Sequence, residues 1–371
     1  MKFVSTATIV ICAVALFSCK GNDSKTTADS KPFLDTAGMN TSVKPGDDFY
    51  EYVNGNWIKK SAIPDDLPGW GSFYAIYEDN LKNLRGILEE AAKGNSAKGS
   101  PEQKTGDYYA AGMDTVAIEK AGASPLKPML DKIASVKDYK ELVNLISESY
   151  ANGDGDLLGF YVGADDKNSA QHIPVFTQSG LSLPEKDYYT RTDSSSVAIR
   201  KALSNHITTL FTLTGTDAGT AAKNADDILA LETEIAKSHR SPVELRDPQK
   251  NYNKMSLADL QKQTPNIDWV NFFAKINAKT DSVNVAQPGY FIALSGLLSS
   301  KPIELWKTKV AFDYISSNAS LLSKAFRDAN FAYNKVMSGT KKDSDRWKKM
   351  VNRVDGGLGE LLGQLYVKKY F

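Results

Sequence analysis

The residues best suited to acid–base or metal chemistry near neutral pH are three histidines, His172, His206 and His239. None begins the His-Glu-x-x-His pattern, which places two zinc ligands on one face of a helix, and no two stand four residues apart. We expect His172 in a strand, His206 on a helix and His239 at a helix end, where the helix dipole favours a protonated imidazole. These are predicted to be structural or surface histidines.

Other common reaction centres are also missing from the sequence. There is no Gly-x-Ser-x-Gly turn for a nucleophilic serine and no Gly-x-x-x-x-Gly-Lys-[Ser/Thr] phosphate loop. The glycines of DGGLGE (355–360) follow no predicted strand, so they do not indicate a nucleotide loop. We therefore predict that the chain carries no catalytic residue and no metal ligand set, and that it binds no cofactor by itself.

The amino terminus has the features of a secretory signal. One lysine precedes an apolar run from Phe3 to Phe17, which is too short to span a membrane. The run ends in Leu16-Phe17-Ser18-Cys19, which resembles the lipobox of bacterial lipoproteins. An ordinary signal peptide with a chance cysteine is the alternative. The pattern predicts a signal peptide over 1–18, lipidation of Cys19 and a polar tether over 19–44, hence a lipid-anchored protein of the bacterial cell envelope that faces the periplasm or the exterior.

Cysteine usage and charge restrict the remaining classes of function. The chain has two cysteines, Cys12 and Cys19, so the lipoprotein prediction leaves no free thiol for a disulfide, a nucleophile or a thiolate metal site. Lysine and arginine number 45 and aspartate and glutamate 44. This balance provides no basic field for a nucleic acid partner, so we predict none.

The chain is predicted to be mainly α. Apolar residues at helical spacing predict helices at 49–57, 77–93, 102–122, 136–153, 196–215, 221–242, 256–265, 267–278, 302–316, 319–337 and 344–371. Two β-branched runs separated by DKNSAQ predict one small β-hairpin at about 157–178. The last helix has an apolar stripe that needs a packing partner, formed by Trp347, Val351, Val354, Leu358, Leu361 and Leu365.

Four ordered segments resemble the neprilysin and endothelin-converting enzyme family of zinc metallopeptidases. The first is DDFYEYVNGNWIKKSAIPDDLPGWGSFYAIYEDNLKNLRGILEEA, and the second is QSGLSLPEKDYYT, with a Gly-Leu-x-Leu-Pro-x-x-Tyr-Tyr pattern. The third is LRDPQKNYNKMSLADLQKQTPNIDW, with an Arg-Asp-Pro-x-x-x-Tyr-Asn-x-Met pattern, and the fourth is the last helix. Together they cover 45–371, which we identify as the N-terminal domain of such a peptidase.

The resemblance implies a helical region that caps a thermolysin-like catalytic domain, with the substrate peptide in the cavity between them. The family's zinc helix and further zinc ligand belong to that catalytic domain, and this sequence contains neither. The resemblance therefore implies that zinc serves the complete enzyme and that the last helix, 344–371, packs against the missing domain. We accordingly expect 355–371 to be frayed in this chain alone.

The resemblance also suggests residues that line the substrate cavity, namely Gly69, Trp70 and Phe73. In neprilysin an arginine at the position of Gly69 holds the free carboxylate of the substrate. Glycine has no donor for such a grip, so carboxylate selection at this position is in doubt. Trp70 and Phe73 match the family, although packing explains them as well as substrate binding does.

Three functions are compatible with these observations. The first is the N-terminal domain of a membrane-anchored metalloendopeptidase that acts on oligopeptides, in a truncated or split form that is inactive alone and needs its catalytic domain in cis or in trans. The second is a non-catalytic lipoprotein that binds peptides or proteins, and the third is an unrelated helical surface scaffold. The DNA after the codon for Phe371 would discriminate between them, because only the first requires it, or another gene, to encode His-Glu-x-x-His.

Lipidation can be tested at Cys19. We expect Cys19→Ser to release the protein from the membrane fraction or to block its processing, because the thiol that carries the lipid is lost. Membrane fractionation and the mass of the mature protein measure both effects. A variant that stays in the membrane fraction at the normal mature mass would disprove the lipobox prediction.

Overall fold

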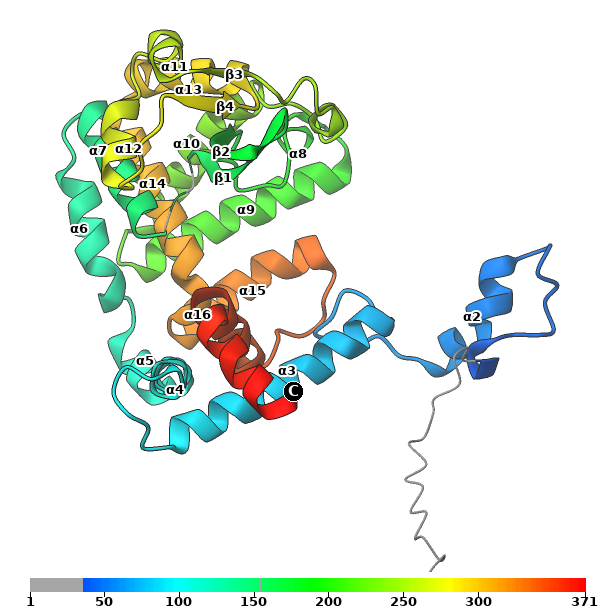
Figure 1. The fold of residues 1–371 in the computed structure, drawn as a ribbon. Helices are drawn as coiled ribbons and strands as arrows, with labels where there is room; N and C mark the ends of the chain where they lie inside the picture. Colours follow the sequence, from blue (N-terminus) through cyan, green and yellow to red (C-terminus); the bar gives the residue numbers. More distant parts are fainter. Residues whose placement is uncertain (1–35, 154, 156) are drawn as a thin grey trace, which may run out of the picture. The chain divides into compact units, whose positions relative to one another are not determined.

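The computed structural model describes residues 36–371 except 154 and 156. Cys12, Cys19 and the predicted signal peptide lie outside the described residues. The chain divides into two compact units, with the boundary between Ile63 and Pro64, and each is described by itself (Figure 1). Within the described chain, no helix has the length and apolar character needed to cross a bilayer.

The first unit contains η1 (Thr36–Gly38) and α2 (Phe49–Lys60). Asp48 caps α2 by accepting a hydrogen bond from the backbone N–H of Glu51. The Asn40 amide donates to the Glu51 carboxylate, which fixes the preceding loop on the helix. Gly55 is buried at this contact, where a Cβ atom would overlap both Glu51 and Asn40. The predicted helix in this segment is therefore confirmed.

The second unit is mainly α, as predicted (Figure 1). Its longer helices are α3 (Ser72–Lys93), α4 (Pro101–Met113), α7 (Tyr139–Ala151), α9 (Ser194–Leu213), α10 (Ala218–Ala236), α13 (Pro288–Ser300), α14 (Ile303–Asn318), α15 (Lys324–Ser338) and α16 (Arg346–Tyr370). The shorter ones are α5 (Thr115–Ala121), α6 (Lys127–Ser135), α8 (Asp187–Thr190), α11 (Leu257–Gln263) and α12 (Trp269–Lys275), with 3₁₀ turns η2 (Ser124–Leu126), η3 (Glu244–Arg246) and η4 (Ala319–Leu321).

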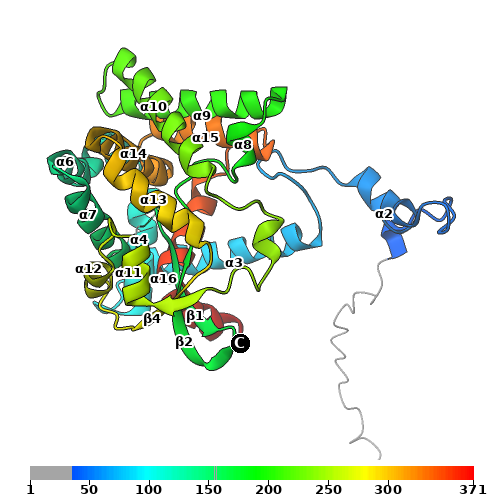
Figure 2. The same cartoon turned by 90° about the horizontal axis from the view of Figure 1, so that it is seen from above.

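The predicted hairpin is present and belongs to a larger sheet. Strands β1 (Gly159–Asp165) and β2 (Asn168–Thr177) pair antiparallel. The sheet continues through β4 (Ser282–Val285), parallel to β2, and β3 (Lys254–Ser256), in the order β1-β2-β4-β3. The hairpin projects at the edge of the unit (Figure 2), so the first five residues of β2 are exposed and the next four are buried.

Several other elements differ from the prediction, among them α6, for which no helix was predicted. Helix α13 was not predicted, because PGYFIALSGLLSS is apolar around most of its circumference and shows no single stripe. The helix predicted over 102–122 is broken at Asp114, whose carboxylate caps α5 by accepting from the N–H of Ala117. The helix predicted from 319 begins as the 3₁₀ turn η4 and becomes α15 only at Lys324.

The packing of α16 corrects our expectation for the last helix. Its stripe, apart from Leu361, packs in a cluster with α3 and α4 of the same unit, so the helix has a packing partner within the described chain. The buried residues of this cluster are Leu81, Leu84, Ile87, Leu88, Tyr109, Met350, Val351, Val354, Leu362 and Leu365. Ion pairs from Lys368 to Glu102 and from Lys369 to Glu90 hold its last turn. Helical periodicity showed that the helix needs a partner but could not show which one.

Helix α16 is bent at Leu358, where the backbone leaves helical angles (φ −133°, ψ 29°). Gly356, Gly357 and Gly359 flank this residue, and each glycine lowers helix stability by about 1 kcal/mol relative to alanine. The DGGLGE segment therefore serves as a bend within a helix and forms no ligand loop.

The packing of α16 predicts a stability difference between two positions of that helix. Leu362 is fully buried, whereas Val367 is 56% exposed. We expect Leu362→Ala to lower the free energy of unfolding by about 2–5 kcal/mol, because it opens a cavity against α3 and α4. Val367→Ala, the matched control, should change it by less than about 0.5 kcal/mol. Urea unfolding followed by circular dichroism measures both, and equal effects would mean that α16 is not packed.

Candidate functional site

The residues predicted to line a substrate cavity lie where α3 begins. Gly69 and Trp70 are half-buried in the loop before the helix, and Phe73, in its first turn, is 89% exposed. Ile76 and Tyr77 are exposed beside it, at the helical spacing that brings them onto the same face. These three side chains form an exposed apolar face, which we call the α3 face. Packing therefore does not explain Phe73 in the described chain.

One polar contact joins the α3 face to α16. The hydroxyl oxygen of Tyr77 lies 2.7 Å from Nδ2 and 3.0 Å from Oδ1 of Asn352. Below the face, Lys348 of α16 pairs with Asp66 at 2.9 Å and with Glu78 at 2.7 Å, and all three side chains are mostly buried. The surface that carries Phe73 is therefore held by charged and polar contacts to the last helix.

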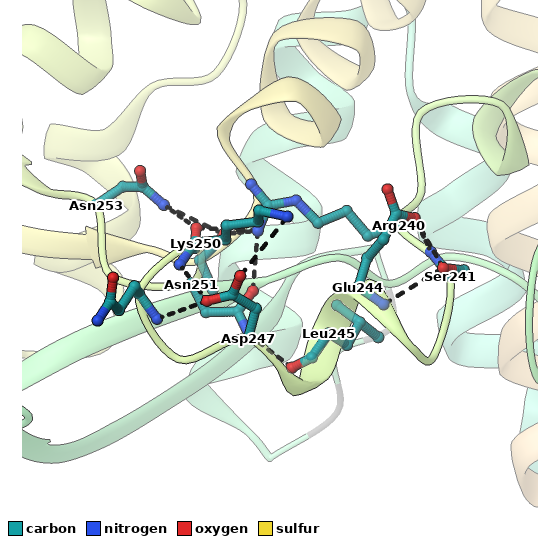
Figure 3. Close-up of polar contacts among 10 residues, drawn as sticks. Arg240, Ser241, Glu244, Leu245, Asp247, Lys250, Asn251 and Asn253 are labelled. Carbon is teal, nitrogen blue, oxygen red and sulfur yellow. Dashed lines mark hydrogen bonds and ion pairs between the residues drawn. The ribbon is translucent and has the colours of Figure 1, made fainter.

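The Arg-Asp-Pro segment forms a polar network around Arg240 (Figure 3). One guanidinium nitrogen, Nη1, donates to the carbonyl of Lys250 at 3.0 Å, to Oδ1 of Asn251 at 2.9 Å and to the carbonyl of Ala286 at 3.1 Å. The backbone N–H and C=O of Arg240 both bond the side-chain amide of Gln178. This residue thereby joins the end of β2, the 240–253 loop and the end of β4.

The side chains of the same segment also close the loop on itself (Figure 3). Asp247 accepts from the backbone N–H groups of Gln249 and Lys250, and Asn251 donates to the carbonyl of Leu245. Of the polar side chains of the pattern, those of Asp247, Tyr252 and Asn253 have partners within the fold. We interpret this pattern as a structural clasp rather than a reaction centre.

A second clasp joins this segment to the tip of the hairpin. The Asp165 side chain is 1% exposed and accepts from Nζ of Lys254 and the hydroxyl of Tyr252, both at 2.8 Å. The bond from Lys254 and that from the N–H of Lys167 lower the pKa of Asp165 to about 2. Asp165 was missed in the sequence, where an aspartate at a hairpin tip is typical of an ordinary turn.

The Gly-Leu-x-Leu-Pro-x-x-Tyr-Tyr segment is fixed to a buried carboxylate, Glu232 of α10. Glu232 accepts from the hydroxyls of Ser182 at 2.6 Å and Tyr189 at 2.5 Å, and Nζ of Lys309 lies 3.0 Å away. Burial alone would lower the pKa of Lys309, but the carboxylates of Asp313 and Glu232 outweigh it and raise the pKa above its ordinary value. This cluster is again fully engaged in holding the fold.

The sequence contained a signal for Glu232 that we did not use. It stands in an apolar stripe with Ile228, Leu231 and Ile235, all of which are buried. A charged residue within such a stripe needs a buried partner. Lys309, flanked by buried Trp306 and Phe312, is the complementary case on α14.

The three histidines do not come together. His172 lies in the exposed part of β2, and the other two are buried. His206 stacks on Tyr333 with ring centres 4.8 Å apart, and Nε2 of His239 lies 3.1 Å from the carbonyl oxygen of Ser179. Burial lowers the pKa of both His206 and His239 to about 4. The prediction of a favoured imidazolium at His239 was therefore wrong, because burial outweighs the helix end.

Across residues 36–371, leaving aside 154 and 156, no three histidine, cysteine, aspartate or glutamate side chains are grouped so that they could hold a metal ion. The buried histidines each contact a partner in the fold, and the buried carboxylates Asp165 and Glu232 are bonded to lysines. The donor set of the described residues does not fit a zinc site.

Comparisons with known proteins agree on one family. The model of peptidase family M13 matches residues 45–371. Endothelin-converting enzyme 1 of Rattus norvegicus is 29% identical over 348 residues, covering 90% of this chain and 45% of the relative. Neprilysin of Mus musculus is 26% identical over 370 residues, covering 90% of this chain and 48% of the relative. The chain spans about half the length of these curated relatives.

A solved structure extends the likeness to the fold. The zinc metalloprotease Zmp1 of Mycobacterium tuberculosis, in complex with an inhibitor, has 32% sequence identity and a TM-score of 0.87. The alignment covers 91% of this chain and 52% of that protein. Its similarity therefore extends over nearly all of this chain and about half of the solved one.

The buried histidines predict a pH dependence of stability. Their folded pKa of about 4 lies below the ordinary 6.5, so the unfolded chain takes up protons first and stability falls as the pH drops from 6.5 towards 4. We expect each histidine to cost about 2 kcal/mol at pH 5 relative to pH 7. Urea unfolding of wild type and His206→Gln at both pH values measures this cost.

The variant should lose roughly half of the histidine-dependent change between the two pH values. His172→Gln, at an exposed position, is the matched control and should follow wild type. An identical pH dependence in wild type and His206→Gln would show that His206 is not held neutral by burial.

Proposed function

Since the chain belongs to peptidase family M13, we propose that residues 45–371 form the non-catalytic N-terminal half of a neprilysin-like zinc metalloendopeptidase that acts on oligopeptides. The observation that carries this proposal is the match of the family model over 45–371, in a chain that spans about half the length of its relatives. The zinc-binding half is supplied by polypeptide outside these 371 residues, in cis or in trans. Without it the chain is inactive.

The role proposed for this half is to cover the substrate cavity and to select flexible peptides by size. The α3 face supports this role, because Phe73 and Ile76 expose large apolar side chains that no described residue covers. Such side chains can contact a peptide or the catalytic half. Gly69 and Trp70 lie in the loop before this face, so they are proposed to border the same cavity.

The proposed location is the bacterial cell envelope, with the protein held by lipid on Cys19. The support for this part is the sequence Leu16-Phe17-Ser18-Cys19 and the polar residues that follow it. One acyl chain gives only reversible membrane binding, and stable anchoring needs more than one. A lipidated cysteine followed by a tether would leave the folded part free to meet soluble peptides.

A second candidate function is a non-catalytic lipoprotein that binds peptides. The observation in its favour is that α16 is packed against α3 and α4, so the second unit has a closed core without the catalytic half. A unit of this kind can fold and present the α3 face independently.

Metal content and peptide cleavage test the first function. We expect the purified mature chain, stripped with chelator and reloaded with zinc, to hold no stoichiometric zinc and to leave a quenched fluorescent peptide uncut, because its donor set does not fit zinc. Adding the polypeptide that carries His-Glu-x-x-His, identified from the DNA after the codon for Phe371 or elsewhere in the genome, should give zinc-dependent cleavage.

One tightly held zinc per chain in the absence of that polypeptide would contradict the proposal. Failure to find such a polypeptide in the genome, combined with peptide binding by the chain alone, would favour the non-catalytic lipoprotein.

A further inference from the structure

A groove of about 500 Å³ lies between α15 and α16 and is also lined by residues of the loop at 340–344. We call it the α15–α16 groove. Asn330, Phe331 and Asn334 line it from α15, and Lys349, Asn352 and Arg353 line it from α16. It is a different feature from the clasps around Arg240, Asp165 and Glu232, because none of their residues lines it.

Two side-chain amides in the groove are available to a ligand. Asn330 and Asn334 form no hydrogen bond with any other described residue, whereas the amides of Asn251 and Asn253 are all engaged in the fold. Four residues along a helix advance by about 6 Å. Alternate residues of an extended peptide are about 6.6 Å apart. The two amides can therefore bond the backbone of alternate residues of one extended peptide.

The groove also has a positive charge without a partner in the described chain. Its two carboxylates are neutralised, Asp66 by Lys348 and Asp343 by Lys349. Lys342 pairs with Asp345. Arg353 is exposed, and no described carboxylate lies within ion-pair distance of its guanidinium. A guanidinium binds a carboxylate through two parallel hydrogen bonds, which is the strongest contact it can offer a peptide.

One hydrogen bond links the groove to the α3 face. Asn352, which lines the groove, is bonded to Tyr77 of that face. A peptide in the groove can thus place a carboxylate at Arg353 and an apolar side chain towards Tyr77 and Phe73. Each part of such a peptide therefore has a matching group on the protein. The two amides can bond its backbone, the guanidinium can bind its carboxylate, and the α3 face can contact its apolar side chain.

We infer that the α15–α16 groove binds an extended peptide through a carboxylate held by Arg353. The inference rests on the proposed function in taking a peptide as the ligand, and it deepens that function by naming the residue that selects the peptide. The carboxylate belongs either to the C-terminus of the peptide or to an aspartate or glutamate side chain. Both present the same planar group to the guanidinium.

Three labelled peptides of one apolar sequence test this inference on the full mature chain by fluorescence anisotropy. The first ends in a free carboxylate, the second in an amide, and the third in an amide with one internal glutamate. We expect at least one acidic peptide to bind ten-fold or more tightly than the neutral one, and the comparison between the two acidic peptides identifies the source of the carboxylate.

Variants locate the contact. Arg353→Gln should reduce the tighter acidic peptide to the affinity of the neutral one and leave the neutral peptide unchanged. Asn330→Ala with Asn334→Ala should weaken all three peptides by a similar factor. Arg191→Gln is the matched control, because Arg191 is also exposed and lies outside the groove. Thermal unfolding of each variant shows that the fold is retained.

The inference is overturned if neutral and acidic peptides bind equally, if Arg353→Gln binds the acidic peptides as wild type does, or if Arg191→Gln loses as much affinity as Arg353→Gln. Absence of binding by all three peptides also overturns it. That last result would leave the proposed peptidase half intact, because zinc-dependent cleavage with the added catalytic polypeptide tests that function separately.

Discussion

The arrangement of the second unit depends on one buried ion pair, between Glu232 of α10 and Lys309 of α14. Both side chains are almost completely removed from water, and such charges are tolerated only when each has close partners. Glu232 has four: the backbone N–H and hydroxyl of Ser182, the hydroxyl of Tyr189, and Lys309. Lys309 also pairs with Asp313, so the more costly change is removal of Lys309, which would leave Glu232 as a buried charge without a cation. Breaking a buried ion pair in this way typically costs about 3–5 kcal/mol. The pair therefore specifies how α10, α14 and the 180–189 segment meet.

The same logic explains the two sequence patterns that first indicated the family. In the 180–189 segment, Gly180 has a φ of +83°, which a residue with a side chain adopts only with strain. This turn delivers Ser182 and Tyr189 to Glu232. In the 240–253 segment, Arg240 and the amide of Asn253 both donate to the carbonyl groups of Lys250 and Ala286 near the sheet. Both patterns satisfy buried polar groups, and neither forms a reaction centre.

Elements with a strong local sequence pattern could be predicted, whereas contacts that depend on tertiary packing could not. Long amphipathic helices such as α3 and α10, and the β1–β2 hairpin, have a strong local pattern and were predicted. Strands β3 and β4 have only three and four residues, too few for an alternating pattern, and α13 is apolar on most sides. The Asp165 clasp joins β1 to β3, and the α15–α16 groove includes Asp66 beside residues of the last two helices, so both bring together segments far apart in the chain. Their partners are selected by tertiary packing, which local periodicity does not encode.

The predicted substrate-cavity residues illustrate the same limit. Phe73 could be selected from the sequence as an aromatic residue of a family segment, but packing and binding explained it equally well. In the described chain packing does not explain Phe73, because Leu81 and Leu88 of the same helix are buried against α16 while Phe73 is almost fully exposed. One helix therefore has a core-facing stripe and an uncovered α3 face.

Under the proposed function, the packing of α16 gives a physical account of how residues 45–371 can fold and still accept a catalytic half. The inner stripe of α16 is buried against α3 and α4, so the described chain itself supplies packing partners for that stripe. A Cβ atom at Gly356 or Gly363 would meet no described atom, so close packing within the unit does not explain these glycines. The α16 surface at these two glycines and the α3 face are therefore both left uncovered by described residues. Under the proposed function, the catalytic half therefore covers an outer surface of the second unit. It does not supply the packing partner of the inner stripe of α16, which α3 and α4 already provide.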